Sequence, residues 1–296
     1  MDRRKFLAGS AAAAAAMWRG PFGLPDAFAT QTAPRSGRTL TLGAKPAPIS
    51  IDTTKTAVLV IDMTNDFGSK GGMFDRAGID ISIIQQAVPP TAKVLESSRT
   101  SGIKIVYLKM AYRPNLSDMG PVDSPNWRVH HGNRVGAVVR APDGAESRIA
   151  IRDTWNTKVI DALKPQAGDI EIYKTRFSGF YQTDLDKTLK RLGARYLIVT
   201  GCTTSVCVES TIRDATFRDY SPILLADCSA EPIGNGLPRS NHEASLLTIG
   251  KCLGWVSSSQ EYVQALEGTE KGAPPSKNST GTPKAGARRD EIFSHQ

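Results

Sequence analysis

The chain has 296 residues, of which 40% are hydrophobic, 7% aromatic and 22% charged, a composition typical of a globular protein with a substantial core. The formal net charge is +8, and basic residues gather near both ends of the chain. The sequence has no basic helix and no interleaving of aromatic with basic residues, so we expect no nucleic-acid partner.

The first 29 residues have the pattern of a twin-arginine export signal. Arg3 and Arg4 precede an apolar pair and an alanine run over residues 11–16, and Ala27-Phe28-Ala29 offers a small-x-small cleavage site. The apolar stretch is shorter than the roughly 20 residues that span a bilayer, so we expect no stable membrane anchor. A disordered basic extension or an uncleaved anchor is the alternative. The pattern predicts a periplasmic or secreted protein.

Short apolar runs then alternate with helical patterns. The expected strands are residues 57–61, 103–108, 170–173, 196–200, 223–226 and 254–257, and the expected helices are 82–100, 184–193, 206–218, 239–250 and 259–267. Apolar strands separated by helices indicate a parallel sheet covered on both faces. The sequence therefore predicts an α/β fold, a doubly wound three-layer sandwich with a mainly parallel six-stranded sheet, in one domain over residues 50–267. Residues 30–49 are expected to form a linker, and residues 268–296 a disordered tail.

Three side chains of chemical interest follow predicted strands. Asp62 comes after the first strand, Lys174 after the third, and Cys207 lies on the turn into the helix after the fourth. Ligands of doubly wound sheets bind outside the carboxyl ends of the strands, where these three side chains would meet. Taken singly, they could be a turn former, a surface charge and a core residue. Their joint placement favours a reactive group.

The expected chemistry of this group is nucleophilic. A thiol at a helix N-terminus meets unpaired N–H groups, which lower its pKa and can hold an oxyanion. A lysine would favour the thiolate, and an aspartate could accept and return the proton. The four cysteines have no CxxC spacing and no pairing with histidine, so we expect neither a metal site nor a disulfide scaffold. Whether Cys202 and Cys207 form a disulfide under oxidation is not decided by the sequence.

Three segments resemble the signature segments of the isochorismatase-like cysteine hydrolases, over roughly residues 50–267. These segments are Asp62-Met-Thr-Asn-Asp-Phe67, Lys174-Thr-Arg-Phe-Ser-Gly-Phe180 and Thr200-Gly-Cys-Thr-Thr-Ser-Val-Cys207-Val-Glu-Ser-Thr. The resemblance implies a hydrolase acting on non-peptide C–N bonds without a cofactor. Cys207 would be the nucleophile, Asp62 the general base and then acid, and Lys174 the residue that orients and polarises.

The same resemblance implies three further features. A non-proline cis peptide is expected between Ser205 and Val206, which would aim the backbone N–H groups of Val206 and Cys207 at the oxyanion. A homo-oligomer is expected because relatives usually form dimers or tetramers. Thr64 stands where many relatives carry glutamine, which removes one expected hydrogen bond in the pocket.

Within the family, the chain most resembles the ureidoacrylate amidohydrolases, and biuret hydrolases share much of the pattern. The segments that carry this likeness are Gly71–Asp80, Ser124–Trp127, Arg176–Phe180 and Cys207–Asp214. The partner implied is a small-molecule amide or ureido substrate that releases ammonia. Phe67, Tyr112, Asn126 and Trp127 are the expected substrate-binding residues, because aromatic walls with one amide suit a planar ureido group. Met110-Ala111-Tyr112 replaces an Asn-Gly-Trp run, which leaves the exact substrate open.

Other readings are less favoured. Nicotinamidases have a metal site after the second strand, where this chain has no histidine between Tyr112 and Asp118. His130 and His131 are adjacent and are expected to be surface residues, because neighbouring side chains on an extended segment diverge. True isochorismatases act without a nucleophilic cysteine. A catalytically silent binding domain is the alternative from another class, and loss of one of the three reactive residues would mark it.

Overall fold

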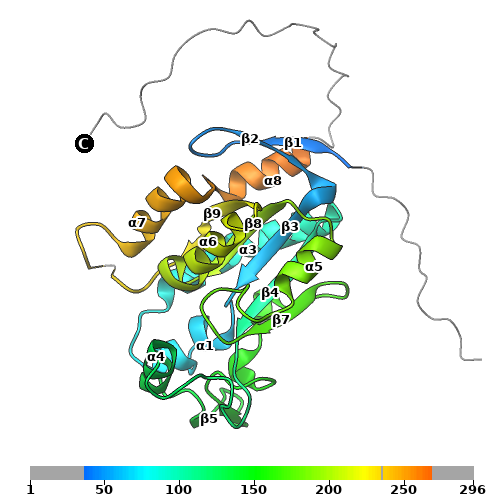
Figure 1. Cartoon of the computed structure of the whole chain (residues 1–296). Helices are drawn as coiled ribbons and strands as arrows, with labels where there is room; N and C mark the ends of the chain where they lie inside the picture. The colour runs from blue at the N-terminus through cyan, green and yellow to red at the C-terminus, as the bar shows by residue number, and fades with distance from the viewer. Residues whose placement is uncertain (1–36, 235, 269–296) are drawn as a thin grey trace, which may run out of the picture. The chain divides into compact units, whose positions relative to one another are not determined.

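The computed structural model describes residues 37–234 and 236–268, and its centre is a six-stranded sheet (Figure 1). The strand order is β10-β9-β8-β3-β4-β7, and each pair of neighbours runs parallel. The strands are β3 (Thr56–Ile61), β4 (Lys104–Met110), β7 (Ile170–Lys174), β8 (Tyr196–Cys202), β9 (Ser221–Ala230) and β10 (Trp255–Ser257). Every residue of β3 is buried, as expected of a central strand covered on both faces.

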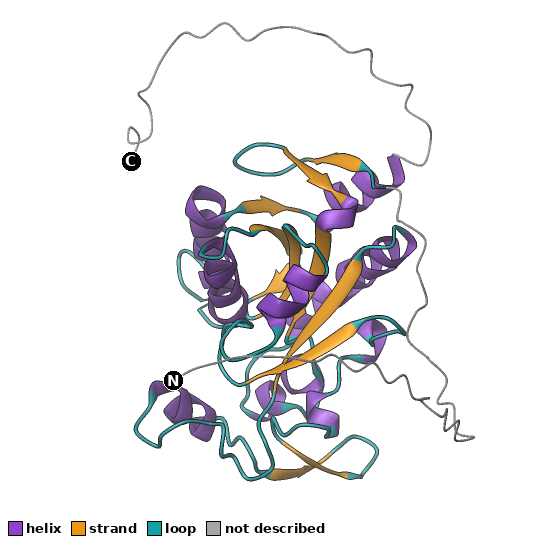
Figure 2. Cartoon of the chain, turned by 45° about the vertical axis from the view of Figure 1, so that its right-hand side comes forward, coloured by secondary structure: helices purple, strands orange, loops and turns teal. Residues whose placement is uncertain are grey.

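Helices lie on both sides of the sheet, so the molecule has three layers (Figure 2). The main ones are α3 (Ser82–Thr100), α5 (Leu185–Arg191), α6 (Glu209–Thr216), α7 (Asn241–Thr248) and α8 (Ser259–Gly268). α3 packs against α8, where Ser98 and Tyr262 share a buried hydrogen bond of 2.9 Å. α6 is joined to α7 by the hydrogen bond from Ser245 to Glu209. The predicted α/β three-layer sandwich is confirmed.

The order in which the chain adds strands to the sheet reverses between β3 and β8. From β3 the chain proceeds outward through β4 to β7, returns to β8 on the other side of β3, and continues through β9 to β10. A crevice opens at the carboxyl ends of strands where such a reversal occurs. The segments that follow these strand ends include α1 (Asn65–Gly68) and α4 (Pro125–Gly132), which lie at one end of the sheet in Figure 1.

The segment 39–52 corrects the predicted linker over residues 30–49. β1 (Thr39–Leu42) and β2 (Ile49–Asp52) form an antiparallel hairpin that contacts α8. Its apolar side chains alternate with polar ones, so one face of the hairpin is buried and the other is exposed. The predicted export signal, most of the predicted tail and residues 30–36 lie outside the described residues.

The remaining elements are short and surround the carboxyl ends of the strands or join larger elements. They are α2 (Met73–Arg76), the antiparallel pair β5 (Val138–Arg140) and β6 (Glu146–Arg148), and the helical turns η1 (Thr53–Lys55), η2 (Trp155–Thr157), η3 (Asp161–Leu163), η4 (Thr204–Val208) and η5 (Ile249–Leu253). Across residues 37–234 and 236–268, the structure contains no helix with the length and apolar character needed to cross a membrane.

Candidate active site

Asp62 is the first residue after β3, and its backbone has a φ of 54°. Aspartate tolerates this left-handed conformation better than most residues. The turn directs the carboxylate at β4, where Oδ1 accepts a hydrogen bond of 2.7 Å from the backbone N–H of Met110. The N–H of Asp62 donates to the carbonyl of Leu108 at 2.8 Å. Asp62 is therefore fixed by two backbone contacts with the neighbouring strand.

Gly201, near the end of β8, allows the two central strands to meet closely beside Asp62. Its φ is +120°, and a Cβ atom at this position would lie 2.0 Å from the carbonyl oxygen of Ile61. Only glycine fits both the backbone conformation and this space. The close approach brings the chain that leaves β8 next to the chain that leaves β3.

Lys174 is the last residue of β7 and is paired in register with Met110. Its side chain is fully buried, and Nζ lies 2.7 Å from Oδ2 of Asp62, which is also fully buried. Nζ also donates to the carbonyl of Arg176 at 3.3 Å. Burial alone would lower the pKa of Lys174, but the nearby charge of Asp62 reverses this, and the net direction is upward. Lys174 is therefore an ammonium ion at neutral pH.

Cys207 lies in the helical turn η4 that follows β8, and only 4% of it is exposed. Its thiol interacts with the side chains of both Asp62 and Lys174. The structure thus brings together the three residues that the sequence singled out, from the ends of three strands. We call Asp62, Lys174 and Cys207 the reactive cluster.

The protonation state of Cys207 differs from the one expected from the sequence. Burial raises the pKa of the Cys207 thiol above its ordinary value, while the charge of Lys174 acts in the opposite direction and is the smaller effect. The expected lowering by a helix N-terminus was therefore wrong in its net direction, because the sequence does not reveal how completely the sulfur is buried. The resting thiol is neutral and needs a base before it can attack.

The backbone before Cys207 corrects a second expectation. The non-proline cis peptide joins Cys202 to Thr203, not Ser205 to Val206. The predicted position falls inside η4, whose helical hydrogen bonds require trans peptides. The N–H of Val206 donates to the carbonyl of Thr203 at 3.1 Å, so an oxyanion would have to share this donor. The assignment of Val206 and Cys207 to an oxyanion hole stays a prediction.

Two side chains that the sequence analysis did not single out hold η4 in place. Glu231 is buried and accepts hydrogen bonds from the backbone N–H of Ser205 at 2.8 Å and from its hydroxyl at 2.5 Å. His242 contacts the hydroxyl of Thr204 at 2.9 Å through Nδ1. Both come from the chain beyond β9. The sequence analysis missed Glu231 and His242 because they lie far from Cys207 in the sequence and belong to no local pattern.

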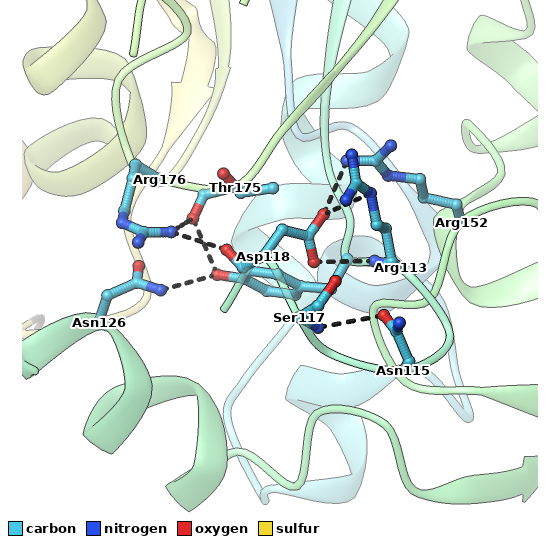
Figure 3. Close-up of polar contacts among 9 residues, drawn as sticks. Arg113, Asn115, Ser117, Asp118, Asn126, Arg152, Thr175 and Arg176 are labelled. Carbon is cyan, nitrogen blue, oxygen red and sulfur yellow. Dashed lines mark hydrogen bonds and ion pairs between the residues drawn. The ribbon is translucent and has the colours of Figure 1, made fainter. Parts of the chain in front are cut away.

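Tyr112 and Asn126 form a polar wall next to Thr175, the residue that follows Lys174, and Figure 3 shows Asn126 close to Thr175 and Arg176. The Tyr112 hydroxyl donates to the carbonyl of Thr175 at 3.1 Å and accepts from Nδ2 of Asn126 at 3.2 Å. Burial raises the pKa of Tyr112 to about 12, and the hydroxyl lies beside Thr175, the residue that follows Lys174. Oδ1 of Asn126 is buried and has no hydrogen-bond partner among the described residues.

The other two predicted substrate-binding residues make mainly packing contacts. The ring of Phe67 meets that of Phe74 edge-on, with centroids 4.9 Å apart. The ring of Trp127 stacks on that of His131 at 4.2 Å, with 12° between the planes. Substrate contact by Phe67 and Trp127 stays a prediction.

His130 was expected at the surface, and this was wrong. It is 4% exposed, its Nδ1 lies 2.7 Å from the carbonyl of Asn126, and its ring lies between those of Tyr112 and Phe177. The adjacent-histidine argument assumed an extended segment, but these residues lie on α4, where neighbours point about 100° apart. Burial lowers the pKa of His130, so its ring is neutral at physiological pH.

Groups suited to holding a metal are not found in the described part of the chain. No set of three or more histidine, cysteine, aspartate or glutamate side chains is clustered there. The lysine in the reactive cluster is itself a buried cation beside the carboxylate, which makes this cluster a poor metal site.

Comparison with known proteins agrees with this geometry. The model of the isochorismatase domain matches residues 56–261. The ureidoacrylate amidohydrolase RutB of Methylorubrum extorquens is 38% identical over 237 residues, which cover 79% of this chain and 93% of that protein. A cysteine hydrolase from Pseudomonas syringae is similar in structure, with a TM-score of 0.60 and 29% identity over 74% of this chain and 95% of that one.

An N-carbamoylsarcosine amidase from Thermoplasma acidophilum is also similar in structure, with a TM-score of 0.51 and 26% identity over 69% of this chain and 96% of that one. The domain match covers most of the described residues, and all six strands of the central sheet begin and end within it. The family expected from the three sequence segments is confirmed. The chain belongs to the isochorismatase family.

Proposed function

We propose that this protein is a cysteine-dependent amidohydrolase that cleaves a carbamoyl or ureido C–N bond through a thioester-type acyl-enzyme. The observation that carries the proposal is the buried reactive cluster, in which a neutral thiol interacts with an ion pair of a carboxylate and an ammonium at the carboxyl ends of the strands. The names of the similar proteins, an amidohydrolase, a cysteine hydrolase and an amidase, support an activity on C–N bonds.

In the first half-reaction, Asp62 takes the proton of Cys207 as the sulfur attacks the substrate carbonyl. A C–S bond forms, and the electron pair of the C=O bond moves to the oxygen. When the tetrahedral intermediate collapses, the C=O bond re-forms and the C–N bond breaks. The leaving nitrogen takes the proton from Asp62 and departs as a neutral amine or ammonia, and Cys207 is left as a thioester.

In the second half-reaction, water attacks the thioester and gives its proton to Asp62. Collapse of the second intermediate breaks the C–S bond, and the sulfur recovers the proton from Asp62. Lys174 keeps its proton throughout, because its ammonium holds the carboxylate in place and stabilises the negative charge that develops nearby. With a ureido substrate, either C–N bond can break, and loss of CO2 from the resulting carbamate completes the release of ammonia or amine.

The substrate class that we propose is a small ureido compound of the ureidoacrylate type. The unpartnered Oδ1 of Asn126 offers an acceptor for a ureido N–H, and the Tyr112 ring gives a flat wall beside it. The likeness to a ureidoacrylate amidohydrolase supports the same class. Biuret is the alternative substrate, because biuret hydrolases share much of the sequence pattern.

The test is ammonia release from a panel of ureidoacrylate-like acids, biuret, N-carbamoyl amino acids and nicotinamide, with the Cys207→Ala variant in parallel. We expect turnover of one ureido compound and its loss in the variant. Turnover that survives in Cys207→Ala would exclude the thiol mechanism. Turnover of nicotinamide alone would exclude the ureido substrate.

We also propose that the protein is exported and forms a homo-oligomer. Export rests on the twin-arginine pattern of the first 29 residues, and self-association rests on the family. Cell fractionation with Arg3→Lys/Arg4→Lys as the control, and light scattering of the purified domain, test these two points.

A further inference from the structure

Arg176 lies at the edge of the reactive cluster and has no anionic partner in the described part of the chain. Nη1 donates to the backbone carbonyls of Thr175 at 2.7 Å and Asp118 at 3.1 Å. Carbonyl oxygens satisfy N–H donors but do not neutralise a charge. Among the described residues, no carboxylate forms an ion pair with Arg176.

The neighbouring arginines behave differently. Nη2 of Arg152 lies 2.9 Å from Oδ2 of Asp118, and Nε of Arg113 lies 3.9 Å from the same oxygen. The carboxylate of Asp118 therefore forms ion pairs with two other arginines (Figure 3). Asp118 therefore presents only its carbonyl to Arg176. The carboxylate of Asp118 is shared by two other arginines and makes no ion pair with Arg176, whose guanidinium lies 5.3 Å from the centre of the Tyr181 ring.

The guanidinium also has an edge available for recognition. Its hydrogen bonds to the described residues all use Nη1, and none uses Nε or Nη2. The edge formed by Nε and Nη2 is the one that holds a carboxylate through two parallel hydrogen bonds. Gly120, at φ +93°, lies so close that a Cβ atom there would be 2.8 Å from Nη2, so the loop restrains the guanidinium.

Arg176 is near the reactive cluster and its polar wall. Its own carbonyl accepts a hydrogen bond from Nζ of Lys174. Nη1 of Arg176 and the hydroxyl of Tyr112 both donate to the carbonyl of Thr175. Asn126 binds the carbonyl of Met119, the residue after the one whose carbonyl Arg176 binds, and Figure 3 shows the two side chains beside each other.

We propose that Arg176 binds the carboxylate of the substrate, so that the site selects ureido acids over neutral ureides such as biuret. The substrate carbonyl would lie at Cys207, a ureido N–H at Oδ1 of Asn126, and the distal carboxylate at Nε and Nη2 of Arg176. This inference rests on the proposed function and assigns its substrate class.

The test compares N-carbamoyl-β-alanine with its primary amide, in which a neutral carboxamide of similar size replaces the carboxylate. Formation of β-alanine or of β-alaninamide is measured in place of ammonia, because the carboxamide group could itself release ammonia. Charge-assisted hydrogen bonds contribute enough that Arg176→Gln should lower kcat/KM for the acid about 100-fold, mainly through KM. Turnover of the neutral amide should change less than about threefold, because the amide has no carboxylate for Arg176 to bind. The loss for the acid should appear mainly in KM, because the carboxylate is bound equally in the ground state and the transition state. Arg176→Lys keeps the positive charge but cannot make two parallel hydrogen bonds to a carboxylate, so it should recover part of the preference for the acid.

Arg113→Gln is the matched control, because it removes an exposed arginine that also lies beside Asp118 and should leave the acid-to-amide ratio unchanged. An equal loss on both substrates in Arg176→Gln, or a wild-type enzyme that does not prefer the acid, would overturn the inference and leave the amidohydrolase assignment intact. Absence of Cys207-dependent turnover of every ureido compound would instead overturn the proposed function and this inference with it.

Discussion

Nζ of Lys174 lies 2.7 Å from Oδ2 of Asp62, and both side chains are fully buried. A buried ion pair is costly to break, since removal of one partner leaves the other charge without compensation. We expect Lys174→Met to lower the free energy of unfolding by about 3–5 kcal/mol and to abolish turnover. Urea unfolding and ammonia release measure the two effects.

The double variant Asp62→Asn/Lys174→Met separates the effect of the ion pair on stability from its effect on turnover. The asparagine Oδ1 can still accept from the N–H of Met110, and no charge remains buried at this position. We therefore expect the double variant to be more stable than Lys174→Met by at least about 2 kcal/mol while staying inactive. Equal stability of the two variants would show that the pair contributes little beyond packing.

The thiol of Cys207 gives a second prediction. Burial raises its pKa, so the rate at which iodoacetamide alkylates Cys207 should keep rising with pH beyond the ordinary thiol range of about 8.5. Mass spectrometry of the Cys207 peptide follows the reaction, with the exposed Cys252 as the reference in the same digest. Lys174→Met should slow alkylation at every pH, because its ammonium favours the thiolate. A plateau below pH 8 would contradict the neutral resting thiol.

Much of the fold could be predicted because the central strands have strong local patterns. The six apolar runs fall within one to four residues of the observed strands, and the helix 82–100 has the observed bounds. The hairpin of β1 and β2 was missed because the threonine, proline and glycine content of residues 30–55 suggested a linker. The alternation of Leu40 and Leu42 with threonines was the signal that could have revealed it.

The reactive cluster could be predicted because each member lies at the end of a strand or in the turn that leads from a strand to a helix. Its environment could not, because burial and charge at the site depend on distant parts of the chain. Glu231 reaches Ser205 across 26 residues, and Arg176 meets Asp118 across 58. The pKa direction of Cys207 was wrong for the same reason, since the sequence identifies a helix start but not the atoms that cover it.

Gly201 gives a prediction about the geometry that joins β3 to β8. Alanine at this position would place Cβ 2.0 Å from the carbonyl oxygen of Ile61 in a backbone conformation that L-residues rarely adopt. We expect Gly201→Ala to lower the free energy of unfolding by at least about 3 kcal/mol, because backbone strain and overpacking add. Gly132→Ala is the control: its Cβ would meet nothing within 4 Å, and it should stay within about 1 kcal/mol of the wild type. Equal stability of the two variants in urea unfolding would rule out the proposed close approach.

Asp66 is a buried carboxylate that joins two segments beside the site. It accepts hydrogen bonds from the N–H of Met73 at 3.0 Å, the N–H of Ala150 at 2.7 Å and Nδ2 of Asn156 at 2.5 Å. Burial nevertheless raises its pKa to about 6, from an ordinary value of 3.8. Between these two pH values the folded state binds more protons at Asp66 than the unfolded state does, so the contribution of Asp66 to stability falls as the pH rises.

The expected fall is about 3 kcal/mol, since each pKa unit corresponds to about 1.4 kcal/mol. The contribution is fully present below pH 3.8 and is lost as the pH rises through about 6. Urea unfolding of the wild type and of Asp66→Asn, measured from pH 3.5 to pH 7.5, isolates this effect, because the asparagine does not titrate and other groups cancel in the difference. A difference that stays flat, or that grows in favour of the wild type as the pH rises, would show that the three hydrogen bonds to Asp66 outweigh its burial.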